Sequence, residues 1–238
     1  MTTKRVLHQF IGHEQEIYSL DISSDSRYIV SGSIDRSIRL WCTEENQCIS
    51  VLRVESGVAS VAISPDGRFV AAGDLNNSIR IWEIQSRTMV EHFESEQGHQ
   101  NSIRSIAFSS DGQTLVSCSL DNTIKIWIFD NANVHLLNGS LLRRSKCVRT
   151  LKGHRDFVLD IAETFDGRWV ISGSKDTNVQ FWDSATGAAQ FTLKGHTNAG
   201  ESHLKRCEKI SANSCRSHFS RLVTSHFPVC NRSGRLKG

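Results

Sequence analysis

The chain has 238 residues, of which 38% are hydrophobic and 22% charged, a composition typical of a globular protein. No apolar run approaches the roughly 20 residues of a membrane-spanning helix, and residues 1–10 lack the apolar core of a signal peptide. We therefore expect no membrane partner, an intracellular location, and seven cysteines that are reduced thiols.

The net charge of +3 is unevenly distributed along the chain. From residue 200 onward, eight Lys and Arg residues stand against two acidic residues, so this segment carries +6 and residues 1–199 carry −3. A basic segment can attract nucleic acid, but Phe219 and Phe227 are its only aromatic residues, too few for stacking on bases. Direct nucleic-acid binding is therefore not predicted.

The clearest signal is an internal repeat. Residues 12–41 open with Gly-His, continue through short apolar runs, and close on Ser-Gly-Ser-x-Asp and Trp41. The same plan ends on Trp82, Trp127 and Trp182. A repeat of about 40–45 residues with these marks is typical of WD40 blades. We expect an all-β WD40 β-propeller fold over residues 1–199, in an incomplete arc of about four four-stranded blades, followed by a non-repeat tail, residues 200–238, that is basic and disordered.

The elements can be placed in chain order from turn residues and strand spacing. Residues 5–11 match the last strand of a preceding blade. The first unit contains four expected strands, residues 17–22, 27–31, 37–42 and 47–53. Ser24-Asp25-Ser26 forms its first hairpin turn, and the later units carry Asp-Gly here, which tolerates the positive φ that such turns require.

The later units vary this plan. The second, residues 58–82, has Val54, Ala72 and Asn76 where the other units have His, Ser and Asp. Residues 129–146 follow the third unit and are rich in Asn, Gly and Ser, so a surface loop is expected before a strand at 147–151. A fifth Gly-His at residues 195–196 starts the pattern again, but it stops at Gly200.

The repeats contain Ser, His and Asp residues that could suggest a hydrolase. The set occurs three times, however, and a hydrolase needs only one active site. A repeated brace, in which Asp, His, Ser and the Trp indole satisfy one another, explains the pattern better. We predict structural tetrads and no catalytic residue; the tetrads are His13, Ser31, Asp35 and Trp41, then His99, Ser117, Asp121 and Trp127, and then His154, Ser172, Asp176 and Trp182.

The tail contains residue types that bind zinc: His203, Cys207, Cys215, His218, His226 and Cys230. Structural zinc sites normally have closely paired ligands such as Cys-x2-Cys, and that spacing is absent. No Gly-rich phosphate-binding loop or paired-carboxylate site occurs either. We therefore predict no metal and no cofactor.

The partner-binding surface of a propeller is expected at its top face, formed by the loops before the innermost strand and those between the second and third strands. Apolar residues near an aromatic residue and an Arg suit protein–protein contacts, although packing against the blade cores is an equally good explanation for some of them. The predicted top-face residues are Glu16, Tyr18, Ile34, Leu75, Ser102, Arg104, Leu120, Phe157, Leu159 and Lys175; Gly57 and Ala59 hold the corresponding positions of the second unit.

The segments GHEQEIYSLDIS, ESGVASVAISPDGRFVAAG, GHRDFVLDIA and SGSKDTNVQFWD resemble the fungal Tup-type general transcriptional corepressors over residues 6–199. The resemblance implies a nuclear scaffold whose propeller, seven-bladed in that family, docks DNA-bound repressors and histone tails. The family's N-terminal helix binds a tetratricopeptide-repeat corepressor partner. This chain resembles blades three to six.

Two alternatives remain open. The chain could be another WD40 adaptor, such as a ubiquitin-ligase substrate receptor. The Trp-Asp-x-Arg that often ends a blade in one class of such receptors does not occur after Trp41, Trp82, Trp127 or Trp182. A non-functional truncated fragment is the second alternative.

Overall fold

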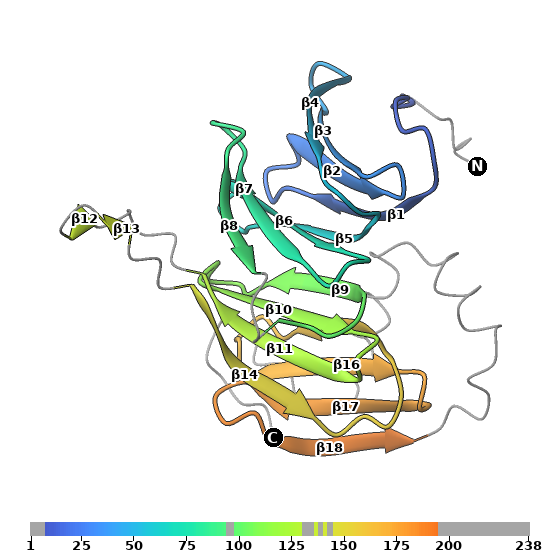
Figure 1. The fold of residues 1–238 in the computed structure, drawn as a ribbon, viewed down its shortest axis with the longest axis vertical. Coiled ribbons are helices and arrows are strands. Elements are labelled where there is room, and N and C mark those ends of the chain that lie inside the picture. Colours follow the sequence, from blue (N-terminus) through green and yellow to red (C-terminus); the bar gives the residue numbers. More distant parts are fainter. Residues whose placement is uncertain (1–7, 94–97, 130–135, 138–139, 142–144, 195–238) are drawn as a thin grey trace, which may run out of the picture. The chain divides into compact units, whose positions relative to one another are not determined.

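The computed structural model describes residues 8–93, 98–129, 136–137, 140–141 and 145–194, all within a compact unit that spans Met1–Thr197. These residues form four antiparallel four-stranded sheets, as expected for WD40 blades (Figure 1). The described residues contain no helix, and thus none that could span a membrane. The predicted tail, residues 200–238, lies outside the described residues.

Each sheet follows the chain from its innermost to its outermost strand. Blade 1 contains β1 (Ile17–Ile22), β2 (Tyr28–Ser33), β3 (Ser37–Cys42) and β4 (Gln47–Arg53). Blade 2 contains β5 (Val58–Ile63), β6 (Phe69–Asp74), β7 (Ile79–Glu83) and β8 (Met89–Phe93). Blade 3 contains β9 (Ile103–Phe108), β10 (Thr114–Ser119), β11 (Thr123–Ile128) and β14 (Lys146–Lys152). Blade 4 contains β15 (Val158–Glu163), β16 (Trp169–Ser174), β17 (Asn178–Asp183) and β18 (Ala189–Lys194).

Local hydrogen bonds explain the first hairpin of each blade. Ser23 Oγ donates to Asp25 Oδ1 over 2.6 Å, and the backbone N–H of Arg27 donates to the same oxygen over 3.0 Å. The chain then turns through a positive φ, 61° at Ser26 and 71° at Gly67 in blades 1 and 2. Glycine adopts this conformation without steric cost, which accounts for the Asp-Gly sequence of the later turns.

The blades pack in chain order through their innermost strands: β1 contacts β5, β5 contacts β9, and β9 contacts β15. Three hydrophobic clusters fill the interfaces. One joins Val30 and Ile38 of blade 1 to Val58 and Val61 of blade 2, and the other two join blade 2 to blade 3 and blade 3 to blade 4. Each blade therefore depends on its neighbours for the burial of its apolar faces.

Some details differ from the sequence prediction. Residues 8–11 are not a strand, and Phe10 instead lies against Trp41, with ring centroids 5.4 Å apart. The strand β2 extends from Tyr28 to Ser33, rather than over residues 27–31. Phe129, which we assigned to a surface loop, is buried, since its ring packs edge-on against Phe69 of blade 2 at 4.9 Å.

The rest of the expected loop is only partly described. Two short strands, β12 (Leu136–Leu137) and β13 (Ser140–Leu141), pair as a hairpin within it. Lys146, placed at the end of that loop, begins β14 instead. The remaining residues, 130–135, 138–139 and 142–144, lie outside the described part of the chain.

Candidate functional site

The predicted tetrad side chains lie together in blade 1. His13 Nδ1 and Asp35 Oδ2 are 2.7 Å apart, His13 Nε2 and Ser31 Oγ are 2.6 Å apart, and Trp41 Nε1 donates to Ser31 Oγ over 2.8 Å. The Asp35 carboxylate can only accept, so His13 donates to it from Nδ1; with this tautomer Nε2 accepts from the Ser31 hydroxyl, whose oxygen in turn accepts the indole hydrogen. The chain of hydrogen bonds ties the entry loop of the blade to β2 and β3.

Blades 3 and 4 repeat this geometry with nearly the same distances. The His–Asp, His–Ser and Trp–Ser separations are 2.9, 2.7 and 2.8 Å in both blades. The residues are His99, Ser117, Asp121 and Trp127 in blade 3, and His154, Ser172, Asp176 and Trp182 in blade 4. The three tetrads thus have the same hydrogen-bond partners, nearly the same distances and the same sequence spacing.

The electrostatics of each tetrad favour the ionised carboxylate. Burial by itself would raise the pKa of Asp35, but hydrogen bonds from Ser37, His13 and the backbone N–H of Glu14 together lower it well below its usual value. The pKa of Asp121 and that of Asp176 are lowered as well, with burial again opposed by hydrogen bonds from the His and from the backbone. The carboxylate is therefore a stable acceptor at neutral pH.

The Ser–His–Asp order also resembles a catalytic triad. The burial of the serine hydroxyl distinguishes a structural role from a catalytic one. Ser31 is 1% exposed, and Ser117 and Ser172 are fully buried. A nucleophile must reach its substrate, and these hydroxyls are enclosed by their own blades. The geometry can stabilise a blade, but it gives a substrate no access to the hydroxyl.

Blade 2 has a different polar brace, which the sequence analysis missed. Asp74 Oδ1 accepts from the backbone N–H groups of Asn76 and Ser78, at 2.9 and 3.0 Å. In blade 1 the two equivalent N–H groups donate to two different acceptors, Ser33 Oγ and Asp35 Oδ1.

The second carboxylate oxygen of Asp74 forms an ion pair. Asp74 Oδ2 accepts from Arg80 Nη1 over 2.6 Å, and the pair is almost entirely buried. Val54, in the place of the tetrad His, packs against the apolar cluster between blades 1 and 2. The only sequence signal was an Asp and an Arg six residues apart.

The predicted top-face residues are paired in every blade by one backbone hydrogen bond. The amide after the second strand donates to the carbonyl before the first: Ile34 to Glu16, Leu75 to Gly57, Leu120 to Ser102, and Lys175 to Phe157, over 2.9–3.1 Å. This bond holds the two loops of each blade together. The eight positions therefore form four equivalent pairs.

Side-chain contacts connect some of these pairs between blades. A Cβ atom at Gly57 would lie 3.0 Å from Ile34 Cδ1 and 3.1 Å from Leu75 Cδ1, so both side chains gather over Gly57. Ser102 Oγ donates to the carbonyl of Leu75 over 2.7 Å, which joins blade 3 to blade 2. These contacts link the loops of blades 1, 2 and 3.

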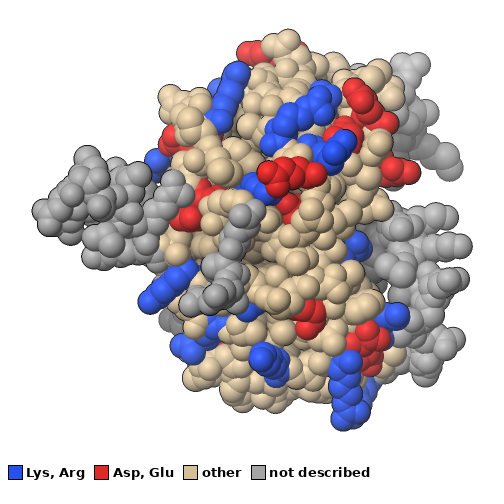
Figure 2. Space-filling model, in the orientation of Figure 1, with Lys and Arg blue, Asp and Glu red and all other residues tan. Residues whose placement is uncertain are grey.

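The residues predicted for the top face differ in exposure. Glu16, Tyr18 and Lys175 are exposed, and the Lys175 ammonium group lies 5.2 Å from the ring centroid of Phe157. Arg104, Leu120 and Leu159 are half-buried, as are Ile34, Leu75, Ser102 and Phe157, whereas Ala59 is buried. On the face seen in Figure 2, basic and acidic side chains are interspersed over the described residues, so no broad field of one sign covers it.

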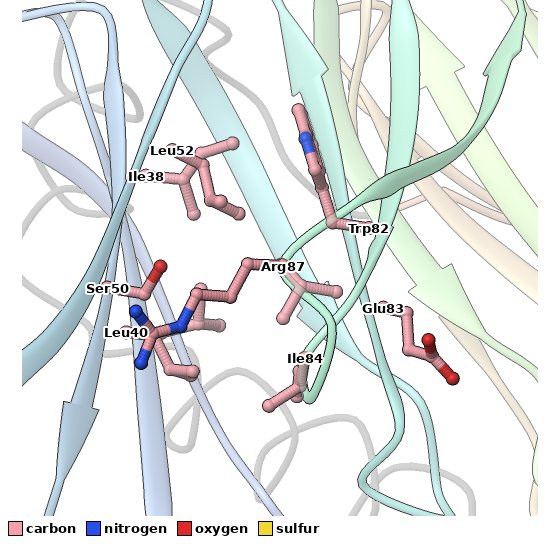
Figure 3. A pocket seen from close by; sticks show the side chains of 10 residues that line it. Ile38, Leu40, Ser50, Leu52, Trp82, Glu83, Ile84 and Arg87 are labelled. Carbon is pink, nitrogen blue, oxygen red and sulfur yellow. The ribbon is translucent and has the colours of Figure 1, made fainter.

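A cavity of about 10 Å³ lies between blades 1 and 2, lined mainly by apolar residues that include Ile38, Leu52 and Trp82 (Figure 3). This volume accommodates about one water molecule. Among the described residues, no group of three His, Cys, Asp or Glu side chains could hold a metal ion. The zinc-type residues of the tail lie outside the described part.

The four blades and their repeated tetrads define a WD40 repeat protein. The model of the family "WD domain, G-beta repeat" matches residues 4–42, 46–83, 91–127 and 145–183, and the chain belongs to this family. It is similar to the transcriptional repressor rco-1 of Neurospora crassa, with 50% identity over 197 residues, which cover 83% of this chain and 32% of that protein.

Two further relatives are also named as a transcriptional repressor or corepressor. The general transcriptional corepressor TUP1 of Saccharomyces cerevisiae is 45% identical over 53 residues, and the transcriptional repressor tup12 of Schizosaccharomyces pombe is 47% identical over 47 residues. These matches cover 22% and 20% of this chain, and 7% and 8% of the relatives. The chain thus spans a third or less of the relatives it matches. The similarity supports a protein-interaction scaffold that resembles a transcriptional corepressor.

Proposed function

We propose that this chain is a non-enzymatic WD40 scaffold of the Tup corepressor type, which docks DNA-bound repressors and histone tails in the nucleus. The observation that carries the proposal is the set of four paired top-face positions, since the same backbone bond presents variable side chains in every blade. A surface of this kind, whose predicted residues include Tyr18, Arg104 and half-buried apolar side chains, suits recognition of a peptide.

The structural role that we propose for the tetrads supports a function without catalysis. Their serine hydroxyls are buried and each accepts a Trp indole hydrogen. Three equivalent copies serve three blades, and blade 2 replaces the tetrad with a buried ion pair. Because the tetrad of three blades is replaced by a salt bridge in blade 2, we assign it a structural role, as a brace within the blade.

Similarity to rco-1, TUP1 and tup12 favours the corepressor assignment over the alternative of another adaptor, such as a ubiquitin-ligase substrate receptor. By analogy with the family, a tetratricopeptide-repeat corepressor is the further partner of the longer relatives. We propose residues 1–199 as the repeat domain and residues 200–238 as a separate basic segment.

The proposal is tested with a labelled peptide from a repressor of the Tup pathway and with a histone-tail peptide. The double variant Tyr18→Ala and Arg104→Ala removes an aromatic side chain and a cation from the top face. We expect binding to weaken by about 30-fold, the loss that corresponds to one hot spot of about 2 kcal/mol. Fluorescence anisotropy measures the affinity, and thermal melting reports on folding.

The matched control is Met89→Ala with Arg149→Ala, which changes an apolar residue and a cation on the outer strands β8 and β14. It should bind as the unchanged chain does. Equal loss of binding in both double variants, or loss of binding together with the melting transition, would contradict the top-face assignment.

A further inference from the structure

In each blade that has a tetrad, the tetrad also positions one exposed residue of the entry loop. The residue that follows the tetrad His donates its backbone N–H to the Oδ2 atom of the tetrad Asp. The three bonds run from Glu14 to Asp35 over 3.1 Å, and from Gln100 to Asp121 and Arg155 to Asp176 over 2.9 Å each. Because the bond uses the backbone, it places no restriction on the side chain, which is exposed in all three blades.

Glu55 holds the same position in blade 2. As in the other blades, two residues separate it from the innermost strand, here β5. Its side chain is 86% exposed and lies 3.7 Å from the Arg80 guanidinium group. That group is already paired with Asp74 at 2.6 Å. Glu55 therefore adds a net negative charge to this face of blade 2.

The four equivalent positions change in charge from blade to blade. Blades 1 and 2 have the acidic Glu14 and Glu55, blade 3 has the neutral Gln100, and blade 4 has the basic Arg155. The blades pack in this same order through their innermost strands. The charge at these positions therefore runs from negative to positive across the top face.

Other charged residues of the top-face loops favour the same order. The exposed Glu16 adds a negative charge to blade 1, and the exposed Lys175 adds a positive charge to blade 4. Arg36 in blade 1 and the half-buried Asp156 in blade 4 oppose them, one in each blade. Blade 1 thus remains the acidic end of the face and blade 4 the basic end.

Charges that occur at the same place in several blades do not alter this order. Arg53 and Lys152 end β4 and β14 at equivalent register positions, and both are basic. Each tetrad contributes one carboxylate, in blades 1, 3 and 4 alike. The difference between the two ends therefore comes from the loop residues that vary.

The loops between these ends carry aliphatic side chains. Ile34, Leu75 and Leu120 hold one equivalent position in blades 1 to 3, and all three are half-buried. In blade 4 the same position holds Lys175. A peptide that fits this face has an aliphatic centre and charges of opposite sign at its two ends.

We propose that the top face orients the peptide that it binds, with basic side chains toward blades 1 and 2 and acidic side chains toward blade 4. Glu14, Glu55 and Arg155 set this orientation. Complementary charges steer and align a ligand more than they add to its affinity. The inference rests on the proposed function, because it names the chemistry of the peptide bound at the same face.

The test selects displayed random peptides against the full 238-residue chain. Peptides of about 12 residues span about 40 Å when extended. The selection is made at low ionic strength, because salt screens attraction between exposed charges. Enriched peptides should carry Lys or Arg in one half and Asp or Glu in the other, in a constant order along the peptide.

A triple variant, Glu14→Arg with Glu55→Arg and Arg155→Glu, exchanges the charges of the two ends and should enrich peptides of the opposite order. A peptide enriched on the unchanged chain should bind this variant about tenfold more weakly at low salt, and the loss should shrink to about twofold or less in about 1 M salt. Arg155→Glu alone should remove the preference for an acidic half. Fluorescence anisotropy measures the affinities.

The matched control makes the same charge exchange at the opposite ends of the strands. Glu44 and Glu45 follow β3, Lys146 begins β14, and all three are exposed. The variant Glu44→Arg with Glu45→Arg and Lys146→Glu should enrich the same peptides as the unchanged chain. Thermal melting of each variant should match that of the unchanged chain, since the backbone bonds of the entry loops do not depend on these side chains.

The outcomes separate this inference from the proposed function. Enriched peptides without separated charges, or a triple variant that enriches the original order, would overturn the orientation and leave peptide binding at the top face in place. Peptides enriched equally by the chain and by its double variant Tyr18→Ala and Arg104→Ala, or no enrichment at all, would overturn both proposals.

Discussion

Arg80 Nη1 donates to Asp74 Oδ2 over 2.6 Å, and this buried pair is the polar brace of the one described blade that has no tetrad. Removing one member of a buried ion pair leaves the other charge uncompensated, at a cost of about 3–5 kcal/mol. We therefore expect Asp74→Ala to lower the free energy of unfolding by that amount, as measured by urea denaturation.

Glu55→Gln provides the control for this variant. Glu55 lies 3.7 Å from the same guanidinium group, but its side chain is 86% exposed. Exposed ion pairs contribute about 0–1 kcal/mol. If Asp74→Ala were no more destabilising than Glu55→Gln, the Asp74–Arg80 pair would not be the brace of blade 2.

The tetrads lead to a second prediction. His154→Ala, Ser172→Ala and Asp176→Ala should each destabilise the chain by about 1–3 kcal/mol, since every change leaves a buried polar group without its partner. A double-mutant cycle for His154 and Ser172 should show coupling, because their atoms are 2.7 Å apart. Esterase or protease activity that disappears with Ser172→Ala but persists in Ser31→Ala would contradict the structural role.

The third prediction concerns two glycines in equivalent positions. Gly73→Ala would place a Cβ atom 2.5 Å from Ile103 Cγ2 and 3.0 Å from Ile103 Cβ, and Ile103 is fully buried. Because Ile103 has no room to move, we expect a loss of about 1–3 kcal/mol from overpacking. Gly173→Ala meets open space and should change the free energy of unfolding by no more than about 0.5 kcal/mol. Similar losses in both variants would show that backbone effects, rather than the neighbouring strand, set the cost.

Much of this fold could be predicted from the sequence, because the repeat encodes it locally. The Ser24-Asp25-Ser26 turn and the spacing from His13 to Trp41 place the strands of the first blade within one or two residues. Phe129 was misassigned, since its burial depends on Phe69, which is 60 positions earlier in the chain and reaches it only across a blade interface. The Asp74–Arg80 brace was missed for a similar reason. It replaces the tetrad with contacts that occur in no other described blade, so the repeat spacing could not predict it.

The last prediction concerns the pH dependence of the contact between blades 3 and 4. Glu163 is the last residue of β15, and the equivalent positions of blades 2 and 3 hold the apolar residues Ile63 and Phe108. Ile63 belongs to the apolar cluster between blades 1 and 2, and Phe108 packs against the cluster between blades 2 and 3. Its Oε2 atom is buried and accepts no hydrogen bond. Burial, together with the nearby carboxylates of Asp111 and Asp166, raises the pKa of Glu163 to about 7 from an ordinary value of 4.5.

A raised pKa means that the folded chain binds this proton more tightly than the unfolded chain does. The resulting stabilisation is fully present below about pH 4.5, and it is lost as the pH rises through about 7. Glu163→Gln, which is neutral at every pH, should therefore melt at a higher temperature than the unchanged chain at pH 8, and this difference in melting temperature should shrink toward pH 5.

Because Glu163 is only partly buried, we expect a modest difference in melting temperature of about 2–4 °C at pH 8. Differential scanning calorimetry at several pH values measures it, with Glu44→Gln, an exposed carboxyl in blade 1, as the control. A difference between Glu163→Gln and the unchanged chain that stays constant from pH 5 to pH 8 would show that Glu163 does not titrate in this range.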